Sequence, residues 1–392
     1  MQTVFNRTRR AVLRVAAISG AVLLAACQPV TVGGGGGPAI NTNAAVPVAL
    51  LVPGGSSQGT DNALAASIEN AARLAISDLD GIKIDLTVYN TGGNAGGAQA
   101  AATQALNDGA KIILGPVYAE SANAAGVVAA QKGVNVLAFS NNPLIAGGNV
   151  FVLGPTFQNT ANRLVRYAAS KGKGSIFVVN AQSEAEDLGK AAITRAISES
   201  SARLAGSASF ELSQQAVVGA IPGMVQQVKS SGTDAIFFTS GNAGAMPFLA
   251  QLLPENGISP AVTQYIGLTR LDVPVQALSQ PGLQGSWFAL PDPNLNNNFR
   301  SRYATAFGTN PPDIAGLGYD GIAAIGALVR QGKSDALTRS ALTQGSGFVG
   351  VNGIFRLRAD GTNQRGLAIA QIQNNQVTVI DPAPRSFGGA GF

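Results

Sequence analysis

Residues 103–116 read TQALNDGAKIILGP, and residues 226–240 read QQVKSSGTDAIFFTS. In both segments a stretch with helical character is followed by a glycine, a short apolar run and a polar loop. A glycine just after the last helical residue is typical of a helix C-terminus. A continuous apolar run of this length is typical of a strand buried on both faces. This order predicts the βαβ unit, which builds a parallel sheet with helices on both faces.

The same pattern recurs on either side of these two segments. Residues 48–52 (VALLV) form an apolar run, and residues 82–88 alternate apolar and polar side chains, as a strand with one less buried face does. A second series of helices and strands begins after Pro155. The sequence therefore predicts an α/β fold with two doubly wound parallel-sheet lobes.

A β-rich segment is expected near the end of the chain, after a further strand at 285–290. The apolar runs 354–357 and 367–373 are separated by Asp360-Gly361, and a third run follows at 377–380. An Asp-Gly pair between apolar runs predicts a hairpin turn.

The first 26 residues have the features of an export signal peptide. Four arginines precede an apolar segment over about 15–26, which is too short to span a bilayer. Residues 24–27 (LAAC) end in Cys27, the single cysteine of the chain, and resemble the lipobox of bacterial lipoproteins, in which the cysteine is lipidated and becomes the new N-terminus. A plain signal peptide that ends near a cysteine is the alternative. Residues 8–14 also resemble a twin-arginine signal, so the export route is left open.

Residues 27–45 are expected to form a flexible tether that joins the lipidated Cys27 to the folded part. This segment is rich in glycine, with five in a row at 33–37. Acyl chains on Cys27 would anchor the protein in a bacterial membrane facing the periplasm. Gln28 stands where an aspartate favours retention in the inner membrane of enteric bacteria, so the outer membrane is favoured.

Composition excludes several classes of function. After Cys27 the chain has 22 basic and 21 acidic residues, so no basic surface for nucleic acid is expected. The absence of histidine excludes Ser-His-Asp and Cys-His catalysis and histidine-ligated metals. With its one thiol lipidated, the chain would form no disulfide or thiolate metal site. We expect a binding protein without cofactor or metal, not an enzyme.

Three segments in order resemble the type I periplasmic-binding-protein fold, and the Leu/Ile/Val-binding proteins in particular. They are VALLVPGG (48–55), AKIILGPVYAESANAAG (110–126) and NVLAFSNN (135–142). Residues 350–380 resemble the C-terminal strands of that family. The resemblance implies two lobes joined by three chain crossings around a hinged cleft. The implied parts are an N-lobe of 46–154 plus 282–342, a C-lobe of 155–281 plus 343–384, and a tail of 385–392.

Ligands of open parallel sheets bind at the carboxyl ends of the strands, where loops and helix N-termini present free amide groups. In the family this edge holds an amino acid between the lobes. We therefore expect the cleft to be lined by residues of these loops. The candidates are Ser56, Ser57, Tyr118, Ala119, Glu120, Ser121, Ser140, Asn141, Asn142, Asn242, Thr269 and Arg270.

The clamp that the family uses for the ammonium and carboxylate groups is altered in this sequence. Leu144 replaces a threonine, Asn242 falls near the position of an aromatic residue, and Leu268 or Thr269 falls near that of an acid. Either the ligand differs, with Arg270 or Glu120 supplying charge, or the cleft has lost its ligand.

Two functions follow from the resemblance. The first is a receptor that delivers a small polar, amino-acid-like ligand to an ABC permease by hinge closure of its lobes. The second is a lipoprotein that activates penicillin-binding proteins, and so regulates peptidoglycan synthesis, through a domain of the same fold.

Overall fold

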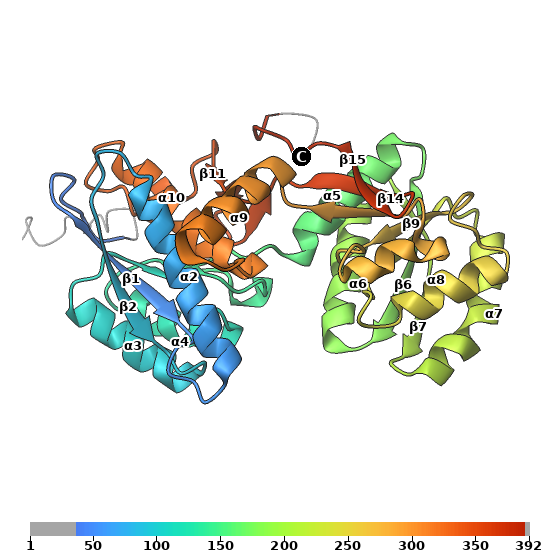
Figure 1. Ribbon diagram of the computed structural model, residues 1–392, viewed down its shortest axis with the longest axis horizontal. Coiled ribbons are helices and arrows are strands. Elements are labelled where there is room, and N and C mark those ends of the chain that lie inside the picture. Colours follow the sequence, from blue (N-terminus) through green and yellow to red (C-terminus); the bar gives the residue numbers. More distant parts are fainter. Residues whose placement is uncertain (1–36, 389–392) are drawn as a thin grey trace, which may run out of the picture. The chain divides into compact units, whose positions relative to one another are not determined.

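The structure is a computed structural model that describes residues 37–388. The predicted signal peptide, the predicted lipidation of Cys27 and the first part of the tether lie outside these residues. Within the described part, no helix is long and apolar enough to cross a membrane. The described chain is organised around two main sheets with helices on both faces (Figure 1).

Five parallel strands form the first sheet, in the order β2-β1-β3-β4-β5. The strands are β1 (Val46–Val52), β2 (Ile84–Asn90), β3 (Ile112–Leu114), β4 (Val136–Ala138) and β5 (Val150–Val152). The helices of this lobe are α2 (Gly59–Ser77), α3 (Ala95–Asn107), α4 (Ala119–Ala130), α9 (Pro293–Phe307), α10 (Gly316–Val329) and α11 (Arg339–Leu342). The βαβ units predicted for this part of the chain are confirmed.

Strand β1 is apolar throughout because both faces of the sheet are covered. Val48 and Leu50 belong to the core cluster that includes residues of α2 and α10. Ala49 and Leu51 point to the opposite face, where α3 and α4 contribute only alanines to the buried core. Successive side chains of a strand alternate between faces, so a strand between two helical layers needs apolar residues at every position.

The segment just before β1 packs onto this lobe. Ile40 is buried in the same core as Val48, and its N–H donates to the carbonyl of Ser334 at 2.8 Å. The predicted flexible tether of 27–45 is therefore wrong in its last residues, since burial of one isoleucine and a backbone hydrogen bond hold this segment against the fold.

The second sheet has seven strands in the order β15-β14-β10-β9-β8-β6-β7. The strands from β10 to β7 are parallel, and β14 and β15 are added antiparallel at one edge. The strands are β6 (Ser175–Gln182), β7 (Arg203–Glu211), β8 (Ala235–Phe238), β9 (Gln264–Gly267), β10 (Trp287–Leu290), β14 (Ala368–Gln373) and β15 (Gln376–Asp381). The helices are α5 (Phe157–Ser170), α6 (Glu184–Ser198), α7 (Gln214–Ser230) and α8 (Met246–Glu255), with 3₁₀ turns at Val275–Ser279 and Pro281–Leu283.

Strand β6 repeats in the second lobe the arrangement of β1. Phe177 and Val179 lie in the core cluster with residues of α7 and α8, whereas Ile176 and Val178 lie in the cluster with residues of α5 and α6. The two lobes are therefore built on the same plan, as the two quoted segments predict.

A small antiparallel sheet of three strands completes the first lobe. Its strands are β11 (Phe348–Gly350), β12 (Gly353–Leu357) and β13 (Asn363–Arg365). The Asp360-Gly361 turn joins β12 to β13, so the predicted turn is confirmed. The predicted partner strand is wrong, because residues 368–373 form β14 and pair with β10 in the second sheet.

The chain passes between the lobes three times, after β5, after β10 and after β13. These crossings correct two expected boundaries. Strand β10 pairs with β9 and β14, so it lies in the second lobe and not with the segment 282–342. Strands β11 to β13 lie in the first lobe and not with the segment 343–384, because Phe348 and Phe355 are buried in the core beneath α10. Periodicity predicts a strand but does not tell which sheet the strand joins.

Candidate functional site

A cavity of about 700 Å³ lies where loops from both lobes converge. The first lobe contributes the segments that follow β3 and β4 and the 3₁₀ turn Asp313–Ala315. The second lobe contributes the start of α5 and the ends of β9 and β10. Cavities of this size at the carboxyl ends of parallel strands are typical binding sites for small organic molecules. The predicted residues that line it are Tyr118, Ala119, Ser140, Asn141, Asn142, Thr269 and Arg270.

The walls of the cavity are largely apolar, with polar groups at separate points. Apolar side chains come from both lobes and include Phe139, Phe157, Leu268, Leu317 and Leu367. The polar residues that the sequence analysis missed are Thr156, Thr160, Asn296, Asp313, Asn352 and Arg365. This combination suits a ligand with an apolar body and a few polar groups.

The remaining predicted residues do not line the cavity; they are Ser56, Ser57, Glu120, Ser121 and Asn242. The loop after β1 is instead tied to α2, because Asn62 accepts the N–H of Gly55 at 2.8 Å and donates to the carbonyl of Ser56 at 3.0 Å. Ser57 and Glu120 are exposed, and Ser121 is buried in the first turn of α4. This expectation failed because position at a strand end does not fix which way a loop folds.

Tyr118 is positioned by a hydrogen bond to an acid of the first lobe. Its hydroxyl donates to Asp61 Oδ1 at 2.5 Å, and this bond raises the pKa of Tyr118. Asp61 is buried in the first turn of α2. The N-cap of this helix is Gln58. The ring of Tyr118 is thus held as a wall of the cavity.

The loop after β4 is folded on its own side chains. Ser140 Oγ accepts the N–H of Asn142 at 3.1 Å, and Asn142 Oδ1 accepts the N–H of Leu144 at 2.9 Å at the start of the 3₁₀ turn Pro143–Ile145. Asn141 makes no hydrogen bond of this kind within the described residues; it is exposed and lines the cavity. These local bonds fix the loop before any ligand binds.

The second lobe presents a guanidinium group to the cavity. Arg270 pairs with Asp272 through Nε to Oδ1 at 2.8 Å and Nη2 to Oδ2 at 2.5 Å, and this bidentate pair raises the pKa of Arg270. Asn242 stabilises the loop that carries Arg270, because its Nδ2 donates to the carbonyls of Leu271 and Val273 at 2.8 and 3.0 Å. Asn242 therefore positions the loop of Arg270 without touching the cavity.

Asp313 brings a carboxylate to the cavity from the first lobe. It is exposed, and its Oδ1 lies 3.1 Å from Nη1 of Arg300. The hydrogen bonds to Asp272 are the main reason why the pKa of Arg270 is raised. The negative charge of Asp313 raises this pKa further. The cavity thus has Arg270 on the second lobe and Asp313 on the first, and it is also lined by Arg365, which is paired with Asp320.

Glu186 is an acid of the second lobe that the sequence analysis did not single out. Its carboxylate accepts hydrogen bonds from the N–H of Ala181 at 2.6 Å, from Thr239 at 2.8 Å and from Ser240 at 2.8 and 2.7 Å. It ties the ends of β6 and β8 to the first turn of α6. Because these donors are occupied, they are not available to a ligand.

A buried ion pair lies where the chain crosses for the third time. Arg365 Nη1 lies 3.2 Å from Asp320 Oδ2, Nη2 of the same arginine donates to the carbonyl of Leu153, and Asp320 Oδ1 accepts the N–H of Val351 at 2.8 Å. Asp320 is 0% exposed and Arg365 is 5% exposed. Beside them, Asn363 Nδ2 donates to the carbonyls of Val152 and of Gly154, at 2.8 and 2.7 Å. These contacts fasten the third crossing to the first one.

In the part of the chain that the structure describes, no group of three or more acids, histidines or cysteines is placed to hold a metal ion. The cavity offers binding through its shape, through hydrogen bonds and through the guanidinium group of Arg270.

Comparisons with solved structures confirm the fold class. A putative branched-chain amino acid ABC transporter protein from Rhodospirillum rubrum has a TM-score of 0.72 at 18% identity, over 86% of this chain and 100% of that one. A branched-chain amino acid transporter substrate-binding protein from Streptococcus pneumoniae, in complex with isoleucine, has a TM-score of 0.55 at 15% identity, over 87% and 100%. A solute-binding protein of an ABC transporter from Rhodopseudomonas palustris, in complex with 3,4-dihydroxybenzoic acid, has a TM-score of 0.56 at 18% identity, over 88% and 97%.

Sequence comparisons give the family. A search of curated proteins finds no significant match. The family described as periplasmic binding protein matches residues 45–376, which include both lobes and all three crossings. The chain belongs to the periplasmic binding protein family.

Proposed function

We propose that this protein is the solute-binding component of an ABC importer and that its ligand is a small amino-acid-like molecule with a carboxylate group. Family membership implies export to the periplasm. The observation that carries the proposal is the cavity of about 700 Å³ with apolar walls, into which the second lobe presents Arg270. Binding between two hinged lobes stabilises the closed state, because only the ligand bridges both sides.

Arg270 supplies the contact for the carboxylate. A guanidinium group has five N–H donors, and the two that Asp272 occupies leave others to face the cavity. The bidentate pair also fixes the plane of the guanidinium group, so little side-chain entropy is lost when the ligand binds. Asp313 on the other lobe supplies an acceptor for an ammonium group.

This arrangement reverses the polarity of the clamp that the resemblance implies. There the second lobe contributes an acid for the ammonium group, whereas here it contributes a cation. The ligand would accordingly lie with its carboxylate toward the second lobe and its apolar side chain among Phe139, Phe157 and Leu317.

The test compares acids with their uncharged amides by thermal shift. We expect leucine or an aromatic acid such as benzoate to raise the melting temperature and leucinamide or benzamide to leave it unchanged. A ligand at 100 times its Kd adds about 2.7 kcal/mol of stability. For about 350 ordered residues this corresponds to a rise of about 4 °C.

Arg270→Gln should abolish the preference for the acid. Arg203→Gln is the matched control, because Arg203 is an exposed arginine of the second lobe whose side chain donates to the carbonyls of Ser231 and Gly232 and does not line the cavity. Equal shifts with acids and amides, or an Arg270→Gln variant that keeps the preference for acids, would refute the assigned role of Arg270.

The alternative of a penicillin-binding protein activator gains no support from the comparisons. Anchoring through a lipid on Cys27, with the outer membrane as the favoured site, remains part of this proposal and rests on the sequence alone.

A further inference from the structure

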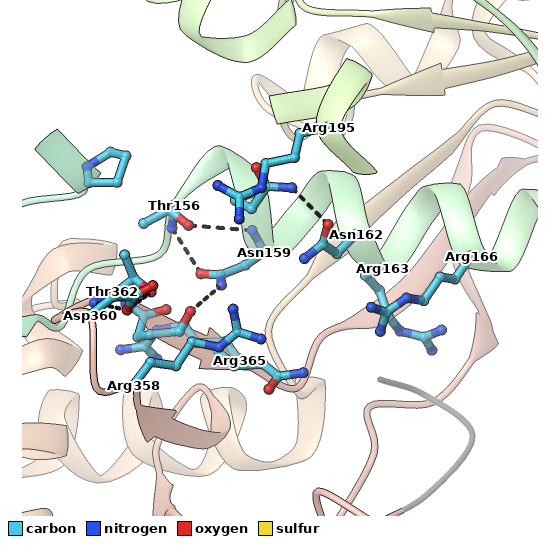
Figure 2. Close-up of a pocket in the computed structure, with 14 residues that line it drawn as sticks. Thr156, Asn159, Asn162, Arg163, Arg166, Arg195, Arg358, Asp360, Thr362 and Arg365 are labelled. Carbon is cyan, nitrogen blue, oxygen red and sulfur yellow. Dashed lines mark hydrogen bonds between the residues drawn. The ribbon is translucent and has the colours of Figure 1, made fainter. Parts of the chain in front are cut away.

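A second cavity, of about 120 Å³, lies between α5, α6 and the turn that joins β12 to β13 (Figure 2). It shares Thr156 and Arg365 with the ligand cavity, and its other lining residues are separate. Five arginines line it, and they come from both lobes: Arg163, Arg166, Arg195, Arg358 and Arg365.

Three of these arginines already have carboxylate partners. Arg163 pairs with Asp381 at 2.6 Å, Arg365 with Asp320 at 3.2 Å, and Arg195 with Glu199 at 2.8 Å. In the Arg195–Glu199 pair both side chains are exposed, and the two residues are four positions apart on one helix. Such pairs contribute little to stability in water. Arg195 therefore keeps most of its capacity to bind another anion.

Arg166 and Arg358 have no hydrogen-bonded side-chain partner within the described residues. Arg166 is half-buried on α5, and Arg358 lies at the turn after β12. Cations crowd at this turn: burial lowers the pKa of the neighbouring Arg356, and the charge of Arg358 lowers it further. An anion in the cavity would relieve this repulsion.

One acid faces these cations. Asp360 Oδ1 accepts hydrogen bonds from the N–H and the hydroxyl of Thr362, at 2.9 and 2.6 Å, and no hydrogen bond joins this carboxylate to a guanidinium group in the described chain. Its pKa is below the usual value, because the bonds from Thr362 and the charge of Arg358 outweigh its partial burial. Asp360 therefore stabilises the turn and leaves the guanidinium groups free to bind an anion.

We infer that this cavity binds a phosphate group, and that the group is held by Arg195 from α6, Arg166 from α5 and Arg358 from the β12–β13 turn. In Figure 2 Arg195 lies above the cavity, Arg358 below it and Arg166 to one side. Donors from three directions suit a tetrahedral oxyanion better than a planar carboxylate, and guanidinium groups bind phosphate oxygens with strong charge-assisted hydrogen bonds. A volume of about 120 Å³ leaves room for a phosphate group.

The bound group would join the two lobes beside the crossings. Arg195 and Arg166 belong to the second lobe, whereas Arg358 belongs to the hairpin whose Gly361 carbonyl accepts the N–H of Val152 in the first lobe. A phosphate that bridges these groups would bias the hinge, in addition to the ligand in the larger cavity. This inference does not depend on the identity of that ligand.

The test is a calorimetric titration of the purified protein with inorganic phosphate at low ionic strength. We expect one site per chain, weakened about tenfold or more by Arg358→Gln and by Arg195→Gln, because each removes a charge-assisted hydrogen bond. Asp360→Asn should tighten binding about two- to fivefold, since it removes a repulsive charge. The opposite signs distinguish a specific site from a general loss of folding.

Arg73→Gln is the matched control. Arg73 is exposed and pairs with Glu69 at i,i+4, as Arg195 does with Glu199, but it lies on α2 and does not line the cavity. A second experiment measures sedimentation of the protein with phosphatidylglycerol vesicles. Vesicle binding that requires Arg358 would identify a lipid headgroup as the source of the phosphate. Binding of inorganic phosphate would identify a free anion as the source. Absence of both, or equal binding by wild type and Arg358→Gln, would overturn the inference.

Discussion

Replacing Arg365 by methionine should leave the Asp320 carboxylate buried without a counter-charge. Asp320 is 0% exposed, and burial raises its pKa while the Arg365 guanidinium and the N–H of Val351 oppose that rise. Removing one partner of a buried pair costs about 3 to 5 kcal/mol. With an unfolding entropy of about 2.1 cal/mol/K per residue over about 350 residues, the melting temperature should fall by about 4 to 7 °C.

The double variant Asp320→Asn/Arg365→Met separates the effect of the unpaired charge from the effect of lost packing. Scanning calorimetry of all variants measures the stability that each effect removes. It buries no charge, so it should lose about half as much stability as Arg365→Met or less. The deficit of Arg365→Met should also shrink from about pH 7 to about pH 5. A folded-state pKa above the unfolded value means that the native state holds its proton more tightly, so stability falls as the pH rises.

An exposed pair provides the control for this cycle. Arg73→Met breaks the pair with Glu69 on α2 and should shift the melting temperature by less than about 1 °C. If Arg365→Met and the double variant lost the same stability at every pH, the ion pair would not be what holds the third crossing.

Three further predictions concern the turn, an acid and the anchor. Gly361→Ala should cost about 1 to 3 kcal/mol in calorimetry, because its φ is +83° and a Cβ atom would lie 2.4 Å from the nitrogen of Gly147; Gly172→Ala, also at positive φ but with open space, should cost less. Arg302→Gln should destabilise the protein at about pH 7, and the difference from wild type should vanish as the pH falls below about 4 in acid unfolding, because the hydrogen bonds from Arg302 hold the pKa of Asp78 below its usual value. Cys27→Ser should move the protein from the membrane fraction to the soluble fraction of expressing cells, and an unchanged distribution would count against a lipid on Cys27.

Much of the fold could be predicted from the sequence, because its buried strands are short apolar runs after helix-ending glycines. Strand β7 (Arg203–Glu211) gave no such signal: it lies at the sheet edge, and of its residues only Phe210 is buried. The crossings were harder to predict. The run Trp287–Leu290 predicts a strand but not its lobe, and its pairing with β9 and β14 assigns it to the second sheet.

The candidate site was predictable only where a loop directly follows a strand. Tyr118, Ser140 and Arg270 were found by that rule and line the cavity. Asn352 and Asp313 were missed, because they reach the cavity only after the chain has returned to the first lobe. No local pattern in the sequence predicts that the chain returns to the first lobe.

The central claim is that a small organic acid binds in the cavity between the lobes. Its most direct test is to titrate amino acids and aromatic acids into the wild type and into Thr160→Trp, in which an indole ring on α5 would project into the cavity and obstruct it. The account predicts that at least one acid binds the wild type with a single site and that the substitution abolishes this binding. Equal binding by both proteins, or no binding of any acid to the wild type, would contradict it.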